Sequence, residues 1–253
     1  SAGGREVLVP LSACQLAAGQ LAGRVPPVAH LQVEEHRAGG AGHQQDRAVR
    51  REAGHTEADV AADITEAIVA EGHSEVAFVI VGSGPNGADP HHECSDRVLQ
   101  AGDVVVVDIG GPVEPGYNSD STRTYSLGEP SPEIAARYAV LQRAQAAAVA
   151  AVRPGVTAQQ IDAAARDVLV DAGLGEYFVH RTGHGIGLSV HEEPYIVAGN
   201  ELPLTEGMAF SVEPGIYFPG HWGARIEDIV IVTADGALAV NTRPHELAVV
   251  PLG

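Results

Sequence analysis

Residues 104–111 read VVVVDIGG, and residues 116–125 read GYNSDSTRTY. Four consecutive β-branched valines predict a buried strand, two glycines end it, and the alternation over 122–127 predicts a returning strand. The two segments therefore predict a hairpin over 104–127, with Asp108 and Asp120 facing each other across it. Burying an unpaired carboxylate costs several kcal/mol or raises its pKa until the group is neutral. Both acids therefore need a compensating positive charge.

The same design recurs nearer the C-terminus. Residues 208–217 read MAFSVEPGIY, a turn is expected around Pro219 and Gly220, and residues 224–232 read ARIEDIVIV. This pattern predicts a second hairpin over 208–232 that carries Glu213 and Glu227. Because the chain contains no lysine to neutralise these acids, their apolar surroundings predict a metal site.

A segment rich in histidine and glycine lies between the two hairpins. Residues 180–194 read HRTGHGIGLSVHEEP, in which the glycines permit close approach of the backbone. Taken alone, each acid and His184 is more typical of a turn, a strand end or a solvated loop. One shared site accounts for them together. Carboxylates with one imidazole suit manganese or other divalent transition ions better than a thiolate-type structural zinc site would.

These segments, together with SGPNGADPHH at residues 83–92, resemble the M24-type metallopeptidases of the pita-bread fold. The resemblance is to the Xaa-Pro dipeptidase and aminopeptidase P branch, which includes creatinase-like and prolidase-like proteins, and it covers roughly residue 54 to the C-terminus. It implies an α+β fold of two pseudo-symmetric halves, with antiparallel sheet flanked by helices and the site between the halves.

Carried over residue by residue, the resemblance implies five ligands of a two-metal centre. Asp120 and Glu227 would bridge both ions, Asp108 would complete one coordination sphere, and His184 and Glu213 would complete the other. The expected ions are two Mn²⁺, with Co²⁺, Zn²⁺ or Fe²⁺ as alternatives that the ligand types do not separate. The histidines expected to contact substrate are His91, His180 and His191.

The expected activity is hydrolysis of the N-terminal Xaa-Pro bond of dipeptides or short peptides. Two ions ~3.5 to 4 Å apart can share a bridging hydroxide and stabilise the oxyanion that follows attack. Glu213 is predicted to shuttle a proton as well, first as a base and then as an acid. His91 and His191 are predicted to hold carbonyl groups, since the proline nitrogen offers no hydrogen. Arg225 is predicted to brace one of the metal carboxylates.

Two other functions fit parts of the pattern. Residues 180–194 alone would also allow a methionine aminopeptidase-like exopeptidase, whereas SDSTRT and RIED favour the proline-specific branch. A catalytically inactive pita-bread protein that only binds peptides is the third reading, although all five ligand positions are filled here. Substrate length, the native ion and the oligomeric state stay open, with a homodimer among the assemblies that the sequence allows.

Composition agrees with a cytoplasmic enzyme. The chain has 253 residues, of which 45% are hydrophobic, enough for one large core or two small ones. A net charge of −18 argues against nucleic acid and anionic membranes as partners, because both require clustered cations. No apolar run approaches the ~18 residues of a membrane helix. The two cysteines do not form a disulfide framework.

The chain divides by composition into an atypical leader, 1–51, and a metallopeptidase catalytic domain, 52–253. The leader holds more arginines than acids, whereas the remainder is strongly acidic. Its poor helix propensity suggests a leader translated from a shifted reading frame or otherwise replaced, since a lysine-free chain indicates GC-rich coding DNA. Beyond it, the apolar spacing predicts helices at 56–72, 131–152 and 157–173 and a strand at 76–81.

Overall fold

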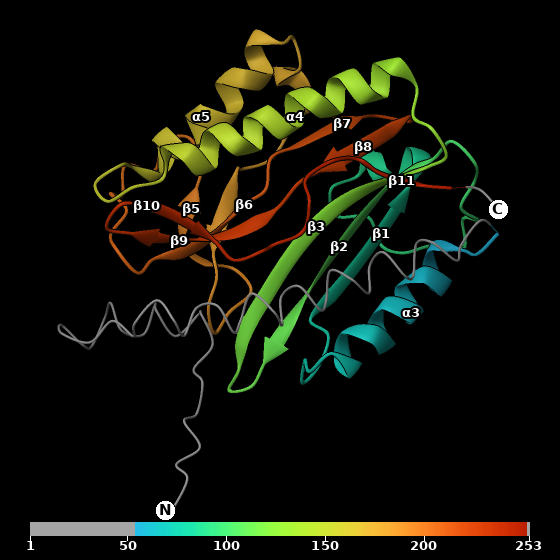
Figure 1. Cartoon of the computed structure of the whole chain (residues 1–253), viewed down its shortest axis with the longest axis horizontal. Helices are drawn as coiled ribbons and strands as arrows, with labels where there is room; N and C mark the ends of the chain where they lie inside the picture. Colours follow the sequence, from blue (N-terminus) through green and yellow to red (C-terminus); the bar gives the residue numbers. More distant parts are fainter. Residues whose placement is uncertain (1–53, 252–253) are drawn as a thin grey trace, which may run out of the picture.

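The computed structural model describes residues 54–251 (Figure 1). The predicted leader, 1–51, lies outside the described residues. Within 54–251, none of the helices combines the length and the apolar character that crossing a bilayer requires. The described part has two halves: the first has one helix, a strand and a long hairpin, and the second has two helices, several short strands and a long hairpin. The predicted α+β class is confirmed.

The first half begins with helix α3, Glu57–Ala70. Its N-cap is Thr56, whose hydroxyl accepts from the Asp59 backbone N–H at 3.1 Å, while the Asp59 carboxylate accepts from the Thr56 backbone N–H at 3.0 Å. The buried apolar side chains on this helix are four residues apart and therefore share one face, which packs on the first sheet. They are Val60, Ile64 and Ile68.

The first sheet has the strand order β1-β2-β3-β11. Its strands are β1 Phe78–Ser83, β2 Val104–Val113, β3 Tyr117–Leu127 and β11 Ala248–Val250. The predicted hairpin over 104–127 is confirmed, but Asp108 pairs with Thr122, and Asp120 pairs with Gly110. The expectation that the two acids lie directly opposite each other was therefore wrong. The register offsets them by two residues, which keeps both on one face of the sheet as diagonal neighbours.

The second half begins with two helices packed on each other, α4 Pro132–Ala151 and α5 Ala158–Asp171. Both match the predicted ranges to within two residues. The second sheet has the order β10-β9-β6-β4-β5. Its strands are β4 Gly183–Gly185, β5 Glu192–Ile196, β6 Ala209–Val212, β9 Asp228–Thr233 and β10 Gly236–Ala239.

The predicted hairpin over 208–232 exists, but both of its arms are interrupted. The first arm is β6 followed by β7, Gly215–Phe218, and the second arm is β8, Trp222–Arg225, followed by β9. β6 pairs with β9, whereas β7 and β8 form a separate two-stranded ribbon. The interruptions contain Glu213-Pro214 and Ile226-Glu227. Pro214 has no N–H to continue a ladder, which helps to end the first arm at this place.

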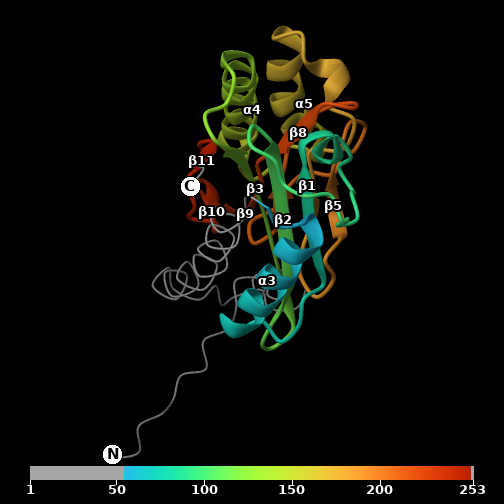
Figure 2. The same ribbon diagram turned by 90° about the vertical axis from the view of Figure 1, so that its right-hand side faces the viewer.

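Two large apolar cores and a smaller cluster around Ile186 and Ile231 hold these layers together. One lies between α4, α5 and the second sheet, around Leu141, Ile161 and Phe210. The other lies between α3 and the first sheet, around Ile64 and Val107. In Figure 2, α4 and α5 lie together at one end of the molecule, and α3 lies toward the other. The hairpins run between them and bring their acids to one place.

Candidate metal centre and cavity

The five predicted ligands come from both halves and meet in the interior. Asp108 lies on β2, Asp120 on β3 and His184 on β4, while Glu213 and Glu227 lie in the two interruptions of the second hairpin. Four of them are less than 9% exposed, and the Glu213 side chain is 15% exposed. The structure therefore brings together residues up to 119 positions apart in the chain (108 to 227).

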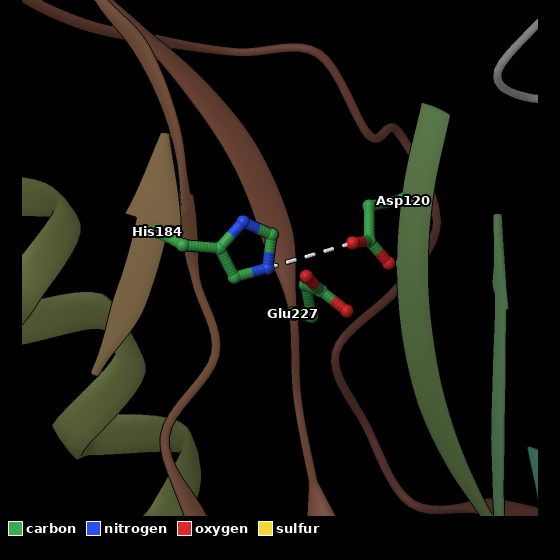
Figure 3. A group of neighbouring side chains, drawn as sticks. All are labelled: Asp120, His184 and Glu227. Carbon is green, nitrogen blue, oxygen red and sulfur yellow. Dashed lines mark ion pairs between the residues drawn. The ribbon is translucent and has the colours of Figure 1, made fainter. Parts of the chain in front are cut away.

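Asp120, His184 and Glu227 have ligand atoms that all lie within 4.8 Å of one another (Figure 3). Three carboxylate oxygens at this place are buried without a hydrogen-bond partner: Asp108 Oδ1, Asp120 Oδ1 and Glu227 Oε1. Buried oxygens of this kind need a proton or a cation to replace lost hydration. Their grouping beside an imidazole nitrogen fits a divalent cation.

The orientation of His184 supports that fit. Its Nδ1 donates to the Gly185 carbonyl oxygen at 3.0 Å, so Nε2 presents a lone pair toward the acids. Nε2 lies 3.3 Å from Glu213 Oε1 and 3.7 Å from Asp120 Oδ2. Burial lowers the pKa of His184 to about 3, so the ring is neutral, and the approach in Figure 3 is not a salt bridge. A lone pair facing carboxylate oxygens is favourable only with a proton or a cation between them.

The acids also repel one another. Burial raises the pKa of Asp120 well above its ordinary value, and Glu227 and Asp108 raise it further. Burial and Glu213 do the same to the pKa of Glu227, while burial raises the pKa of Glu213 to about 7. The sequence argument considered lysine as the source of positive charge, but buried Arg225 supplies one cation against these carboxylates. One guanidinium leaves a negative excess, which two divalent ions would offset.

Arg225 connects the acids to the cavity wall. Its Nη2 donates to Asp108 Oδ2 at 2.6 Å, and its Nη1 donates to the Tyr217 hydroxyl oxygen at 2.8 Å. The Tyr217 hydroxyl lies 2.8 Å from His180 Nε2, while His180 Nδ1 donates to the Arg181 carbonyl oxygen at 2.6 Å. Burial and the Arg225 charge lower the pKa of His180 to about 3, so the ring is neutral and accepts from Tyr217.

Two polar residues of this network were not predicted from the sequence. The Thr122 hydroxyl donates to Glu227 Oε2 at 2.6 Å and accepts from Arg225 Nε at 3.1 Å, so it joins the two hairpins. Tyr217 joins His180 to Arg225. Both lie inside segments that drew attention for their acids, and no spacing rule marks them.

A cavity of about 520 Å³ opens beside the acids. All three histidines predicted to contact substrate, His91, His180 and His191, line it. His191 packs edge-on against His184, with ring centroids 4.1 Å apart. Lining residues that the sequence analysis did not single out are Phe78, Ile80, Pro90 and Arg181. Pro90 and Arg181 are adjacent in sequence to His91 and His180, and that position is the one signal that could have indicated them.

This fold, with its acid-lined cavity between two hairpin-bearing halves, is the pita-bread architecture expected of a metallopeptidase. The chain matches metallopeptidase family M24 over residues 34–234 and belongs to that family. The predicted resemblance and fold are confirmed. The family assignment agrees with a donor set suited to divalent metal.

Two curated relatives show how close the similarity is. The chain is 77% identical over 199 residues to a probable dipeptidase PepE of Mycobacterium tuberculosis, covering 79% of this chain and 53% of that protein. It is 47% identical over 173 residues to an Xaa-Pro dipeptidase of Lactobacillus helveticus, covering 68% of this chain and 47% of that protein. The chain thus spans about half the length of these relatives.

Solved structures agree with this comparison. The crystal structure of dipeptidase PepE from Mycobacterium ulcerans superposes with a TM-score of 0.81 at 68% identity, covering 94% of this chain and 68% of that one. The prolidase from Pyrococcus furiosus superposes with a TM-score of 0.80 at 38% identity, covering 83% of this chain and 63% of that one.

Proposed function

We propose that this chain hydrolyses the bond between an N-terminal residue and proline, in dipeptides or short peptides, with two divalent metal ions, most favourably Mn²⁺. The observation that carries the proposal is the convergence of three unpartnered carboxylate oxygens and the Nε2 lone pair of His184 beside the cavity. The names of the relatives, dipeptidase and Xaa-Pro dipeptidase, support the substrate class.

The five residues would divide between two ions as the resemblance implies. Asp120 and Glu227 would bridge both ions, Asp108 would complete one set of ligands, and His184 with Glu213 would complete the other. When bound, the ions supply an activated water at neutral pH and Lewis-acid polarisation of the scissile carbonyl. Arg225 orients Asp108 through its 2.6 Å hydrogen bond, and Thr122 orients Glu227 in the same way.

Glu213 would move the proton. It lines the cavity, where it would take a proton from the attacking water and return it to the leaving amine. The Ser211 hydroxyl donates to Glu213 Oε1 at 3.0 Å, and the Glu213 backbone N–H donates to the Thr182 carbonyl oxygen at 2.8 Å. These two bonds hold the carboxylate at the edge of the cavity.

The cavity histidines would hold the substrate. A proline nitrogen has no hydrogen, so an Xaa-Pro substrate cannot dock as an ordinary strand, and side-chain donors must hold its carbonyl oxygens. His91 and His191 line the cavity and can donate from a ring nitrogen, and His180 stands beside them. Phe78 and Ile80 offer an apolar wall for the substrate side chains.

Activity assays on the manganese-loaded chain test this proposal. Ala-Pro, a longer Xaa-Pro peptide and a Met-Ala peptide would be compared before and after chelation, with manganese added back. We expect cleavage of the Xaa-Pro substrates, loss on chelation and recovery with manganese. Preferential Met-Ala cleavage would indicate a methionine aminopeptidase-like enzyme. Peptide binding without cleavage would indicate the inactive binding protein, and unchanged activity after complete metal removal would contradict the metal mechanism.

We also infer a cytoplasmic enzyme whose partner is its peptide substrate. The net charge of −18 disfavours nucleic acid and anionic membrane surfaces, and Cys94 is a free thiol, which suits a reducing compartment. The homodimer left open by the sequence is tested by sedimentation velocity, in which a monomer peak at micromolar concentration would exclude it at that concentration.

A further inference from the structure

His91 reaches the cavity on a segment that contains little regular structure. Residues 83–95 run from the end of β1 through a short 3₁₀ turn, η2, Gly84–Ala88, and then along irregular chain. Near His91, the His91 backbone N–H donates to Asp89 Oδ1 at 3.0 Å, and the Pro90 carbonyl accepts from Arg225 Nη1 at 3.2 Å. The first bond is local and the second ties Pro90 to β8, but neither holds the two ends of the segment.

Glu57, the first residue of α3, holds that segment through hydrogen bonds to its carboxylate. It is 0% exposed, although a carboxylate is costly to bury. One oxygen, Oε1, accepts from the Ser83 backbone N–H at 2.8 Å and from the Ser83 hydroxyl at 2.6 Å. The other, Oε2, accepts from the Ser95 backbone N–H at 3.2 Å and from the Ser95 hydroxyl at 2.6 Å. The side chain therefore joins the two ends of the segment.

The middle of the segment is held by the same carboxylate. The Asn86 side-chain amide donates to both Glu57 oxygens at 3.1 Å, and His92 Nε2 lies 2.7 Å from Glu57 Oε2. An ionised carboxylate can only accept, so His92 donates from Nε2. His92 is the residue next to His91, and its ring is directed to Glu57 while His91 lines the cavity.

The charge on Glu57 is stabilised where it lies. Burial by itself would raise the pKa of Glu57, but hydrogen bonds from Ser83, Ser95 and His92 outweigh that effect and lower the pKa below its usual value. A fully hydrogen-bonded buried charge adds little net stability compared with a packed apolar residue. A buried carboxylate of this kind can instead hold the residues that hydrogen-bond to it in one fixed geometry.

We propose that Glu57 is a positioning residue for His91. By holding His92 and both ends of segment 83–95, it keeps the His91 ring directed into the cavity. Glu57 does not itself line that cavity. The inference rests on the proposed function only where it says that His91 contacts the substrate.

A double-mutant cycle separates positioning from plain stabilisation. Glu57→Gln keeps the side-chain shape but replaces one acceptor oxygen with a donor group. The expected result is a loss of about tenfold in kcat/KM for Ala-Pro with His91 present and less than about twofold in a His91→Ala background. All variants are measured as the manganese-loaded full chain, with activity expressed per manganese-loaded site.

Two matched controls sharpen the cycle. Asp162 on α5 is also buried, and it accepts from the Thr182 hydroxyl at 2.7 Å, so it holds the segment that carries His180 instead. Asp162→Asn should lower kcat/KM by the same factor with and without His91. Glu66→Gln, on the exposed side of α3, should leave kcat/KM unchanged. An equal loss for Glu57→Gln in both backgrounds would overturn the proposal.

A second readout does not depend on hydrolysis. The ring carbon resonance of His91 is assigned in ¹³C-histidine-labelled protein loaded with diamagnetic Zn²⁺, because Mn²⁺ would broaden it, by its disappearance in His91→Ala. In Glu57→Gln it should shift or broaden, while the resonance of exposed His221 stays in place. An unmoved His91 signal in a folded variant would refute the inference. If wild type cleaves no Xaa-Pro substrate, the proposed function fails, and this spectrum still decides the role of Glu57.

His92→Ala provides the second variant if Glu57→Gln does not fold. It removes only the 2.7 Å hydrogen bond beside His91, so the fold should tolerate it better. The expected result is again a loss that vanishes in the His91→Ala background, together with a displaced His91 resonance. Retention of full activity and an unchanged resonance in His92→Ala would contradict the proposal.

Discussion

The two hairpins each bring two acids to the site, but they hold them by different means. The β2–β3 hairpin is continuous, so register alone places Asp108 and Asp120 on one face. The second hairpin leaves the second sheet on both arms, and Glu213 and Glu227 lie where it leaves. A side chain at such a break is not fixed by strand pairing, so it needs other contacts.

Those contacts come largely from outside the second hairpin. The Glu227 backbone N–H donates to the Thr122 carbonyl oxygen at 3.2 Å, and the Thr122 hydroxyl donates to the Glu227 carboxylate. Arg123 Nη1 donates to the Glu227 carbonyl oxygen at 2.6 Å. The Glu213 backbone N–H is held by Thr182, from the histidine segment. The first hairpin is thus organised locally, whereas the second depends on tertiary contacts with the first.

The largest effect should follow from removing an acid from either hairpin. Asp120→Asn and Glu227→Gln are each expected to lower kcat/KM for Ala-Pro by more than about a thousandfold, because each removes a charged oxygen from the shared site. Elemental analysis should show less manganese per chain. The exposed Asp171→Asn serves as the control and should behave as wild type. Full manganese content and activity in either site variant would show that the acid from that hairpin is not needed in the shared site.

Gly183 in the second half offers a test of packing rather than of charge, because it lies close to the backbone of a neighbouring strand. A Cβ on Gly183 would collide with the Ser211 carbonyl, where β4 lies against β6. Gly183→Ala is therefore expected to lower the free energy of unfolding by about 3 kcal/mol, measured by urea denaturation. Gly155→Ala has open space around its Cβ and positive φ, so it should lose only about 1 kcal/mol. Equal losses of unfolding free energy in Gly183→Ala and Gly155→Ala would show that the close approach of Gly183 to Ser211 does not determine the cost.

Thr122→Val sharpens the claim that the second hairpin relies on the first. The change leaves Glu227 Oε2 and Arg225 Nε without their hydroxyl partner, and kcat/KM should fall about 10- to 100-fold. Thr122→Ser keeps the hydroxyl and should retain most of the activity. If valine and serine variants behave alike, the hydroxyl does not orient Glu227.

The smallest expected effect compares the N-terminal caps of α3 in the first half and α5 in the second. On α3 the Thr56 hydroxyl accepts from the Asp59 backbone N–H, whereas on α5 the Thr157 hydroxyl donates to the Gln160 side chain at 3.2 Å. Thr56→Ala should therefore lower the free energy of unfolding by about 1 kcal/mol, and Thr157→Ala by a few tenths. Thermal or urea unfolding measures both. A larger loss at Thr157 would reverse the ranking.

Local patterns predicted most regular elements. Helices 56–72, 131–152 and 157–173 correspond to α3, α4 and α5, and the hairpin at 104–127 corresponds to β2–β3. The strand predicted at 76–81 lies at 78–83. Strands β4, β5, β10 and β11 were not predicted, because they are three to five residues long and β4 consists of Gly-His-Gly. Short strands carry no readable alternation and form only because neighbouring strands are present.

The site was predicted as a set of residues, together with the bracing role of Arg225, whereas the supporting contacts of Thr122, Tyr217 and Glu57 were not predicted. Acids in apolar surroundings can be recognised in a sequence, since burying them demands an explanation. Thr122, Tyr217 and Glu57 cannot be recognised in that way. A threonine, a tyrosine and an acid in the first turn of a helix are ordinary residues, and their roles depend on partners distant in the chain.

By itself, the sequence determined which segments form helices and hairpins and which acids demand a common positive partner. Those features depend on side-chain periodicity and on the cost of burying charge, which act over a few residues. Tertiary structure alone decided the two-residue offset of Asp108 and Asp120, the division of the second hairpin between two sheets, and the hold of Glu57 on segment 83–95. These features depend on strand register and on hydrogen bonds between segments separated in the chain, and neither can be read from side-chain periodicity.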